Sequence, residues 1–276
     1  MVLNSGQYEL ESDFKYVWSE NNKYGKEMIF ALLHETGNNA AEIACHFGPS
    51  DHPEVPGRWQ YYGVSLPFWR SYDKEDPRRE FFYYDYTGDA KRDDQSDYGF
   101  HYMVPEEGVT VVPNDTTKYM QNVATMKYTY DMISDAYYDG RTICIFRLSD
   151  VILCKAEIEN NLNGPAAALP YLNQIRARAG APEYGKHNRF PAPSTKEAMN
   201  DAILKERGYE LVFEFQRRAD LIRFGKYEEV VNAHLKKLGI AQPTNVTSSL
   251  RYFPYPLNDA QLNPNLAAEN PSRLPK

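Results

Sequence analysis

The sequence lacks any apolar run near the ~20 residues that a membrane-spanning helix requires, so we expect no transmembrane segment in this chain. Residues 1–6 also lack the basic start and apolar core of an export signal, which indicates either a cytosolic protein or a piece excised from a longer exported chain. Cysteine is scarce. Cys45, Cys144 and Cys154 are odd in number and irregular in spacing, which argues against a disulfide framework or a zinc site and predicts free thiols.

No cluster of lysine and arginine offsets the net charge of −7, which argues against nucleic acid or an anionic membrane surface as a direct partner. His34 and Glu35 begin a stretch that lacks the second histidine of a zinc-protease helix. A nucleophile elbow and a phosphate-binding loop are missing as well. We therefore predict no metal, no cofactor and no enzymatic activity.

Aromatic residues are abundant, with 22 tyrosines in the chain and eleven aromatics among the 28 residues from 59 to 86. Sugars stack their C–H faces on exposed aromatic rings while nearby polar groups bind the hydroxyls. Some of these rings are therefore candidates for ligand binding, and packing in the core is the alternative. The candidate ligand-binding residues are Arg58, Trp59, Tyr61, Tyr62, Trp69, Tyr83 and Tyr84.

Residues 203–225 carry the strongest charge pattern, and we predict them to be the second half of a long helix. Ser194, with a glutamate three residues later, has the capping-box spacing that marks a helix start. Glu206, Glu210 and Glu214 recur every four residues and so share one helix face. Because an unpaired buried carboxylate is costly, we expect arginine partners at a partly buried seam, with a solvated face as the alternative. The predicted structural ion network comprises Glu206, Arg207, Glu210, Glu214, Arg217, Asp220 and Arg223, with Arg218 as a further candidate partner.

Hydrophobic periodicity predicts a mainly α fold with tetratricopeptide-like helical pairs, a loop-rich excursion and a few short strands. We divide the chain into a loop- and strand-rich part, residues 1–140, and a helical part with an extended tail, residues 141–276. Because one helical pair cannot close its own hydrophobic face, we expect an exposed apolar patch on the pair containing Leu148 and Leu169 unless a partner covers it. The predicted elements are strands at 28–33, 109–112 and 126–130, helices within 147–180 and at 227–237, and a proline-rich extended tail from 252.

The order E-R-x-x-E-L-x-x-E-x-x-R-x-x-D-L-x-R-x-G over residues 206–225 resembles the C-terminal signature of the SusD/RagB family. Asp76-Pro77-Arg78 is similar to the family's D-P-R motif, and residues 172–180 are similar to its L-N-x-V-R-x-R-A-G. Arg218 and Ala219 depart from the aromatics usual after the signature arginine. The matches extend over residues 26–271, about the second half of a family protein, which favours an excised piece.

The resemblance implies an α–α superhelical fold and a non-catalytic protein of Bacteroidetes that captures a glycan for a SusC-like TonB-dependent transporter. It also implies an outer-membrane, cell-surface location, with a lipid anchor in the full-length protein. Two other functions stay open. One is a glycoside hydrolase using Glu206, Glu210 and Glu214, although neighbouring arginines would keep these carboxylates ionised. The other is a helical-repeat adaptor or a peptide-binding protein of the RagB type.

Overall fold

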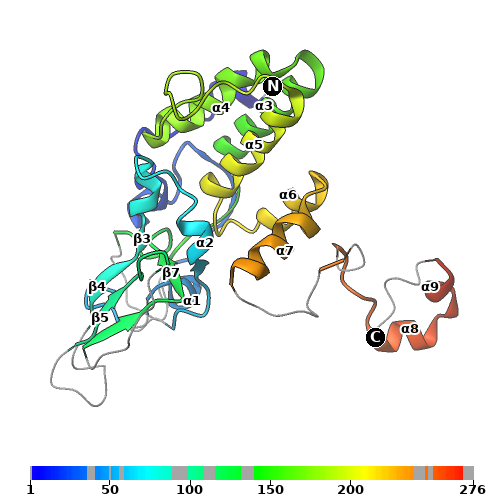
Figure 1. Cartoon of the computed structure of the whole chain (residues 1–276). Coiled ribbons are helices and arrows are strands. Elements are labelled where there is room, and N and C mark those ends of the chain that lie inside the picture. The colour runs from blue at the N-terminus through cyan, green and yellow to red at the C-terminus, as the bar shows by residue number, and fades with distance from the viewer. Residues whose placement is uncertain are drawn as a thin grey trace. The chain divides into compact units, whose positions relative to one another are not determined.

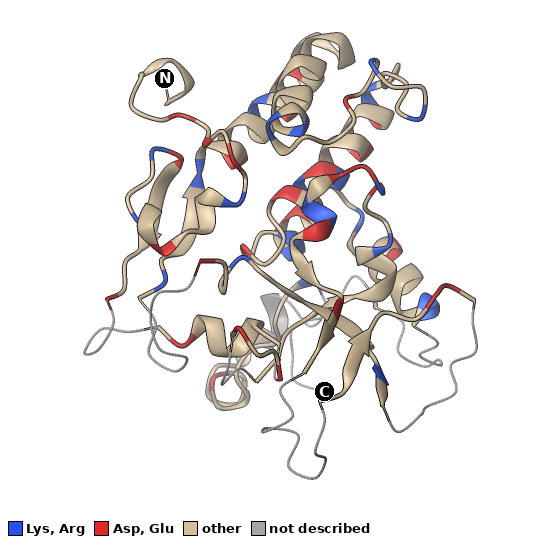
Figure 2. Cartoon of the chain, turned by 90° about the vertical axis from the view of Figure 1, so that its left-hand side faces the viewer, with Lys and Arg blue, Asp and Glu red and all other residues tan. Residues whose placement is uncertain are grey.

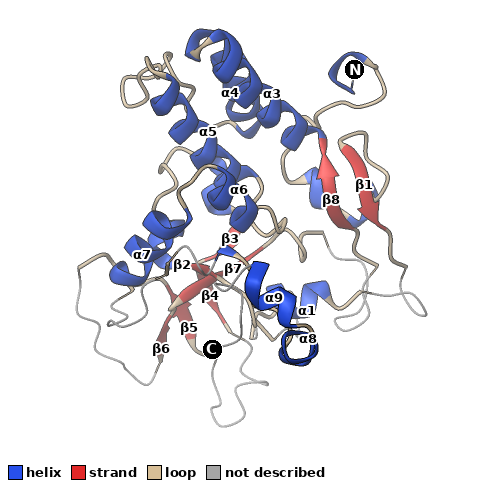
Figure 3. Cartoon of the chain, turned by 90° about the vertical axis from the view of Figure 1, so that its right-hand side faces the viewer, coloured by secondary structure: helices blue, strands red, loops and turns tan. Residues whose placement is uncertain are grey.

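Helices predominate over short strands in the part of the chain that the structure describes (Figure 3), in agreement with the predicted fold class. The structure is a computed structural model that falls into two compact units, residues 1–215 and 216–276 (Figure 1). This boundary differs from the expected division after residue 140, because strand pairing and ion pairs join the segments on either side of that position. The described residues are 2–35, 41–49, 51–55, 59–88, 99–108, 116–131, 140–238, 246–247 and 251–269.

Three helices of the first unit pack against one another (Figure 1): α3 (Leu148–Asn163), α4 (Pro165–Ala179) and α5 (Lys196–Glu210). Gly164, with φ of 90°, turns the chain between α3 and α4, and Pro165 begins α4 as predicted. Gly180 adopts the left-handed conformation that ends α4. The helices bury apolar side chains with no exposed surface, namely Leu153, Leu172, Ile175, Met199 and Ile203.

Helix α5 differs from the prediction at both ends. Its N-cap is Thr195, whose hydroxyl accepts a hydrogen bond from Ala198 N at 3.1 Å, and not Ser194. The helix ends at Glu210 and does not continue to residue 225. A turn follows in which Phe213 and Phe215 have φ values of 61° and 64°, a left-handed conformation that a right-handed helix cannot contain.

The strands of the described residues form three small sheets, in which β1 pairs with β8, β7 lies between β2 and β3, and β5 lies between β4 and β6. All pairs are antiparallel except β5 with β6. The strand bounds are β1 Met28–Leu32, β2 Val64–Ser65, β3 Phe82–Tyr83, β4 Asp85–Thr87, β5 His101–Met103, β6 Thr117–Tyr119, β7 Asn122–Thr125 and β8 Ile143–Arg147. Short helices between them are η1 Val2–Asn4, η2 Tyr16–Trp18, η3 Glu20–Asn22, α1 Ile43–Phe47, α2 Leu66–Trp69 and η4 Pro77–Glu80.

The strand predicted at 28–33 is confirmed as β1, whereas the strand predicted at 126–130 is wrong. Pairing there ends with β7 at Thr125, and residues 127–130 form a turn. This turn buries the side chains of Lys127 and Tyr128, so the alternation of apolar and polar residues did not reflect one buried face. The strand predicted at 109–112 lies outside the described residues.

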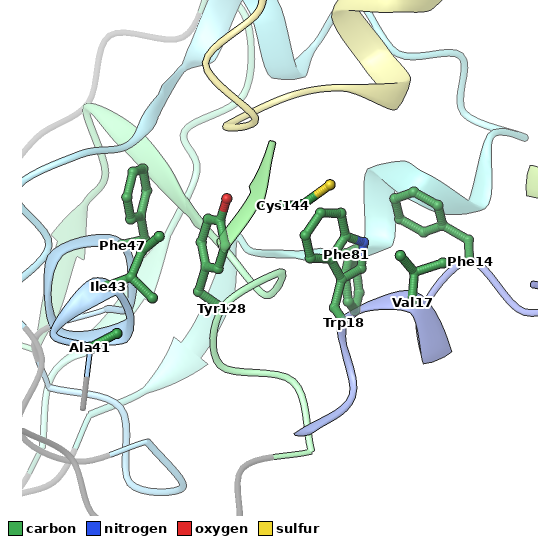
Figure 4. Close-up of a cluster of buried hydrophobic side chains, with 9 residues drawn as sticks. All are labelled: Phe14, Val17, Trp18, Ala41, Ile43, Phe47, Phe81, Tyr128 and Cys144. Carbon is green, nitrogen blue, oxygen red and sulfur yellow. The ribbon is translucent and has the colours of Figure 1, made fainter. Parts of the chain in front are cut away.

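Aromatic side chains make up much of the core of the first unit. One cluster, drawn in Figure 4, brings Phe14 and Trp18 from the N-terminal segment together with Phe81, Tyr128 and Cys144. A second cluster packs Trp69 and Phe82 around Val123 and Tyr209. The structure describes all three cysteines, and none of them forms a disulfide.

The second unit contains α6 (Arg217–Arg223), α7 (Tyr227–Lys237), α8 (Leu257–Leu262) and α9 (Pro264–Glu269). Helix α7 is confirmed, but the prediction of a wholly extended tail is wrong. Proline at the start of α8 and α9 is compatible with helix formation, because the first turn needs no donor from its backbone nitrogen. Among the described residues, we find no helix with the length and apolarity needed to cross a membrane.

Candidate functional site

The glutamates that the sequence singled out lie in the interior of the first unit. Glu206 and Glu210 belong to α5 and Glu214 to the turn after it, and all three side chains are almost completely buried. Arg147, at the end of β8, reaches two of them. Its Nη1 lies 2.7 Å from Glu210 Oε1, and its Nε lies 2.7 Å from Glu214 Oε2. These ion pairs are shielded from water, because Arg147 has no exposed surface.

Arg78 is a second centre of the same cluster. Its guanidinium nitrogens lie 2.7 Å from Asp76 Oδ2, 2.6 Å from Glu206 Oε1 and 2.9 Å from Glu210 Oε2. Asp76 Oδ1 also accepts the backbone N–H of Arg78 at 3.0 Å. The Asp-Pro-Arg turn thus places an acid and a base beside α5 in a single local structure.

Three more cations complete the cluster: Lys127 lies 2.6 Å from Glu214, Arg176 lies 2.7 Å from Glu206, and Arg178 pairs with both Glu27 and Glu210. Among the described residues the charges balance, and Figure 2 shows acidic and basic segments gathered in the same region. Five carboxylates, on Glu27, Asp76, Glu206, Glu210 and Glu214, face five cations, on Arg78, Lys127, Arg147, Arg176 and Arg178. We call these ten residues the buried charge network.

The network holds Glu210 and Glu214 in the ionised form. Burial by itself raises the pKa of Glu210, but Arg178, Arg147 and Arg78 outweigh it and leave that pKa well below its ordinary value. Burial also raises the pKa of Glu214, but Arg147 and Lys127 outweigh it and lower that pKa. An ionised carboxylate cannot donate a proton, so these side chains are unsuited to general acid catalysis. Their geometry suits a scaffold that connects the helices to the strands.

The predicted ion network maps only partly onto this cluster. Glu206, Glu210 and Glu214 are brought together, while Arg207 pairs separately with Asp150 at 2.7 Å. Arg217, Asp220 and Arg223 lie on α6 in the second unit, where Arg223 Nη2 is 3.0 Å from Asp220 Oδ1. Sequence reasoning did not include the cations Arg78, Lys127, Arg147, Arg176 and Arg178 in the network. Arg78, Arg176 and Arg178 nevertheless stand in the motifs that resemble the family.

Three of the predicted ligand-binding aromatics form a second feature at the end of α1. The N–H of Trp59 donates to Cys45 O at 2.7 Å, and the N–H of Tyr62 donates to His46 O at 3.1 Å. Carbonyls in the last turn of a helix have no partner inside the helix, so α1 offers them to this segment. We call Trp59, Tyr61 and Tyr62, together with His46 beside them, the aromatic platform.

Strand β7 holds the same segment from another direction. Gln60 has a φ of 48°, and its side-chain Nε2 donates to Asn122 Oδ1 at 3.1 Å. Gly63 lies so close that a Cβ atom there would be 2.0 Å from Asn122 Oδ1. A left-handed residue that is not glycine persists only when its surroundings fix it. The platform is therefore attached to the scaffold and is not a free loop.

Two rings of the platform, those of Tyr61 and Tyr62, face solvent, whereas Trp59 and His46 are half-buried. Tyr61 is 66% exposed and Tyr62 is 56% exposed. The ring centroids of Trp59 and Tyr61 are 5.4 Å apart at an interplanar angle of 35°, and the His46 imidazole meets Trp59 edge-on at 5.2 Å. Exposed aromatic faces held at fixed angles can stack on the apolar face of a sugar ring.

The other predicted ligand-binding residues are not part of the platform. Trp69 is 5% exposed and Tyr83 is 8% exposed, so both are core residues and leave no free ring face for a ligand. Trp69 Nε1 donates to Arg79 O at 3.2 Å. Tyr84 is half-buried, leans on Trp69 and donates to the Glu80 carboxylate. Arg58 lies outside the described residues.

The helical pair α3 and α4 exposes some apolar surface, although Leu148, which was expected in an exposed patch, is buried and Leu169 is half-buried. A groove of about 930 Å³ lies between α3, α4 and the N-terminal segment, and its lining includes Leu148, Val151 and Tyr171. Ile158 and Leu162 of α3 are also exposed. The groove mixes polar and apolar side chains and shares no residue with the platform.

Comparison with known proteins identifies relatives. The family model of the SusD family matches residues 26–272. SusD-like protein P25 of Formosa agariphila is 39% identical over 120 residues, which cover 44% of this chain and 22% of that protein. The starch-binding protein SusD of Bacteroides thetaiotaomicron is 28% identical over 137 residues, covering 49% of this chain and 22% of the relative.

Solved structures share the fold. Surface glycan-binding protein A from Bacteroides thetaiotaomicron, in complex with laminarihexaose, aligns with a TM-score of 0.66 at 22% identity, over 95% of this chain and 55% of that one. A SusD homolog from the same organism aligns with a TM-score of 0.65 at 25% identity, over 88% and 50%. The chain spans about half the length of these proteins, or less. The match to the family model and this shared helix-rich fold confirm the resemblance seen in the sequence, and the chain belongs to the SusD family.

Proposed function

We propose that this chain is the glycan-binding part of a non-catalytic surface protein and that the aromatic platform contacts the sugar. The observation that carries the proposal is the exposure of Tyr61 and Tyr62 on a segment that α1 and β7 both hold in place. Rings that are ordered before binding lose little conformational entropy when a ligand stacks on them. The relatives support a glycan as the ligand class, since one is named as starch-binding and another was solved with laminarihexaose.

We further propose that the full-length protein is lipid-anchored at the outer-membrane surface and passes its glycan to a SusC-like TonB-dependent transporter. Membership of the SusD family supports this arrangement. The buried charge network supports a binding role over catalysis, because Glu210 and Glu214 are ionised and inaccessible. Incubation with oligosaccharides should therefore release no shorter products, as measured by chromatography.

Binding is tested with an array of plant, algal and microbial polysaccharides, followed by calorimetry on the strongest binder. We expect Tyr61→Ala and Tyr62→Ala each to weaken binding by about two- to tenfold, since stacking of one ring contributes on the order of 0.5–1.5 kcal/mol. Tyr24→Ala is the matched control, because Tyr24 is also a highly exposed tyrosine and lies outside the platform. Absence of binding to every polysaccharide, or equal affinities for all three variants and the unaltered chain, would overturn the proposal.

A further inference from the structure

The imidazole of His46 is the polar group at the centre of the aromatic platform. Its ring centroid lies 5.2 Å from that of Trp59, 5.4 Å from that of Tyr61 and 6.3 Å from that of Tyr62. Across the described residues, neither ring nitrogen of His46 takes part in a hydrogen bond, and Nδ1 is buried. Buried polar side-chain atoms are usually hydrogen-bonded, so an imidazole with both nitrogens unused needs an explanation.

The burial of Nδ1 indicates which tautomer the ring adopts. A neutral imidazole carries its proton on one nitrogen and leaves the other as an acceptor. A buried N–H without an acceptor is rarer than an under-used acceptor, so the proton belongs on Nε2. His46 is partly exposed to solvent, but its Nδ1 atom is buried. The part of the residue that faces solvent therefore lies away from the Nδ1 edge. The platform therefore contains one N–H donor that no group of the described residues uses.

We propose that His46 is a specificity-determining residue, whose Nε2–H donates a hydrogen bond to an oxygen of the sugar that stacks on Tyr61. This inference rests on the proposed function. Stacking alone tolerates many sugars, because most pyranose rings present an apolar face, whereas a directional hydrogen bond distinguishes one hydroxyl arrangement from another. A sugar with an oxygen in reach gains this bond without breaking any bond within the protein. A sugar without one displaces water from this donor and leaves it unpaired, which costs affinity.

The alternative role for His46 is ring packing alone, and two substitutions separate the two roles. His46→Phe keeps an aromatic ring against Trp59 and Tyr61 but removes both nitrogens. His46→Gln loses the ring but keeps an N–H donor. We use both variants with five hexasaccharides as probes in calorimetry: laminarihexaose, maltohexaose, cellohexaose, mannohexaose and xylohexaose.

The unaltered chain should prefer some of these five probes over others. His46→Phe should weaken binding of the preferred probe roughly five- to tenfold, the value of one hydrogen bond, and should bring the five affinities closer together. His46→Gln should retain more of the preference than His46→Phe. The inference is overturned if His46→Phe leaves the preference unchanged, or if both variants weaken all five probes by the same factor, because packing alone would give those results.

The tautomer provides a readout that does not depend on affinity. Long-range ¹⁵N–¹H spectra of the histidine rings, with His46 assigned from the His46→Phe variant, should show the proton on Nε2, and the preferred hexasaccharide should shift that resonance. A proton on Nδ1 would contradict the proposal. If none of the five probes and no polysaccharide on the array binds, the proposed function fails and this inference fails with it. If Tyr61→Ala abolishes binding while His46→Phe leaves the preference intact, only this inference fails.

Discussion

Arg147 and Glu214 form a two-pronged ion pair in the interior of the protein, with Nε 2.7 Å from Oε2 and Nη2 2.8 Å from Oε1. Two parallel hydrogen bonds between a guanidinium and a carboxylate fix both distance and orientation. The pair joins the end of β8 to the turn after α5, and that turn places Phe213 against Phe47 at 4.9 Å. Phe47 in turn contacts Tyr62 at 5.2 Å, so a row of packed rings extends from the buried charge network to the aromatic platform.

Removal of one charge from the network should be strongly destabilising. Glu210→Gln keeps the shape of the side chain but leaves Arg147, Arg78 and Arg178 short of a counter-charge. We expect a loss of about 3–5 kcal/mol in the free energy of unfolding, measured by urea denaturation. The control is Glu197→Gln on the same helix, where the carboxylate is exposed and the change should stay within about 0.5 kcal/mol. Similar values for the two variants would show that the network contributes little.

Acid should weaken the fold through Glu210 and Glu214. Both have a lower pKa in the folded protein than in the unfolded chain, so the unfolded chain binds more protons as the pH falls. Their contribution to stability is therefore complete above the ordinary glutamate pKa of about 4.3 and is lost progressively below it. Urea midpoints between pH 7 and pH 3 should fall mainly below about pH 5. Glu210→Gln should make this dependence shallower, and an unchanged slope in that variant would contradict the assignment.

The turn after α5 should favour glycine. Phe215 has a φ of 64° and is 64% exposed, so its replacement sacrifices little packing. Phe215→Gly should be more stable than Phe215→Ala by about 1 kcal/mol. The Cβ atom of alanine makes the left-handed conformation sterically unfavourable, whereas glycine has no Cβ atom and adopts it readily. At Lys205, an exposed position inside α5, the order should reverse, with alanine more stable than glycine by about 1 kcal/mol. Thermal unfolding of the four variants measures both differences.

Gly63 should be required for the shape of the aromatic platform. Gly63→Ala places a Cβ atom 2.0 Å from Asn122 Oδ1, so the Asn122 side chain must move and its hydrogen bond with Gln60 must break. We expect a loss of about 1–3 kcal/mol in stability together with weaker glycan binding. Asn122→Ala creates room for the new methyl group, so the double variant should be more stable than the sum of the two single effects predicts. If the effects of the two substitutions on stability are additive, the clash with Asn122 is not the cause of the lost stability.

The sequence alone was sufficient to predict features that depend on residues close together in the chain. Helix α7, the start of α4 at Pro165 and its end at Gly180 follow from hydrophobic spacing and from the backbone preferences of proline and glycine. The order of charged residues over residues 206–225 was enough to predict membership of the SusD family, which the family model confirms. The four-residue spacing also placed Glu206 and Glu210 on one face of a helix.

Only the tertiary structure decided which groups meet. The cations around Glu210 come from positions as distant in sequence as Arg78. The helix ends before Glu214, and the left-handed Phe213 that follows it packs against Phe47, more than 160 residues away in the sequence. Trp69 and Tyr61 both lie among aromatic residues in the sequence, yet Trp69 is buried and Tyr61 is exposed. Burial, ion pairing and the unused nitrogens of His46 depend on contacts between segments far apart in sequence. The spacing of residues within a segment predicts its secondary structure. Burial and pairing depend instead on which distant segments pack against it.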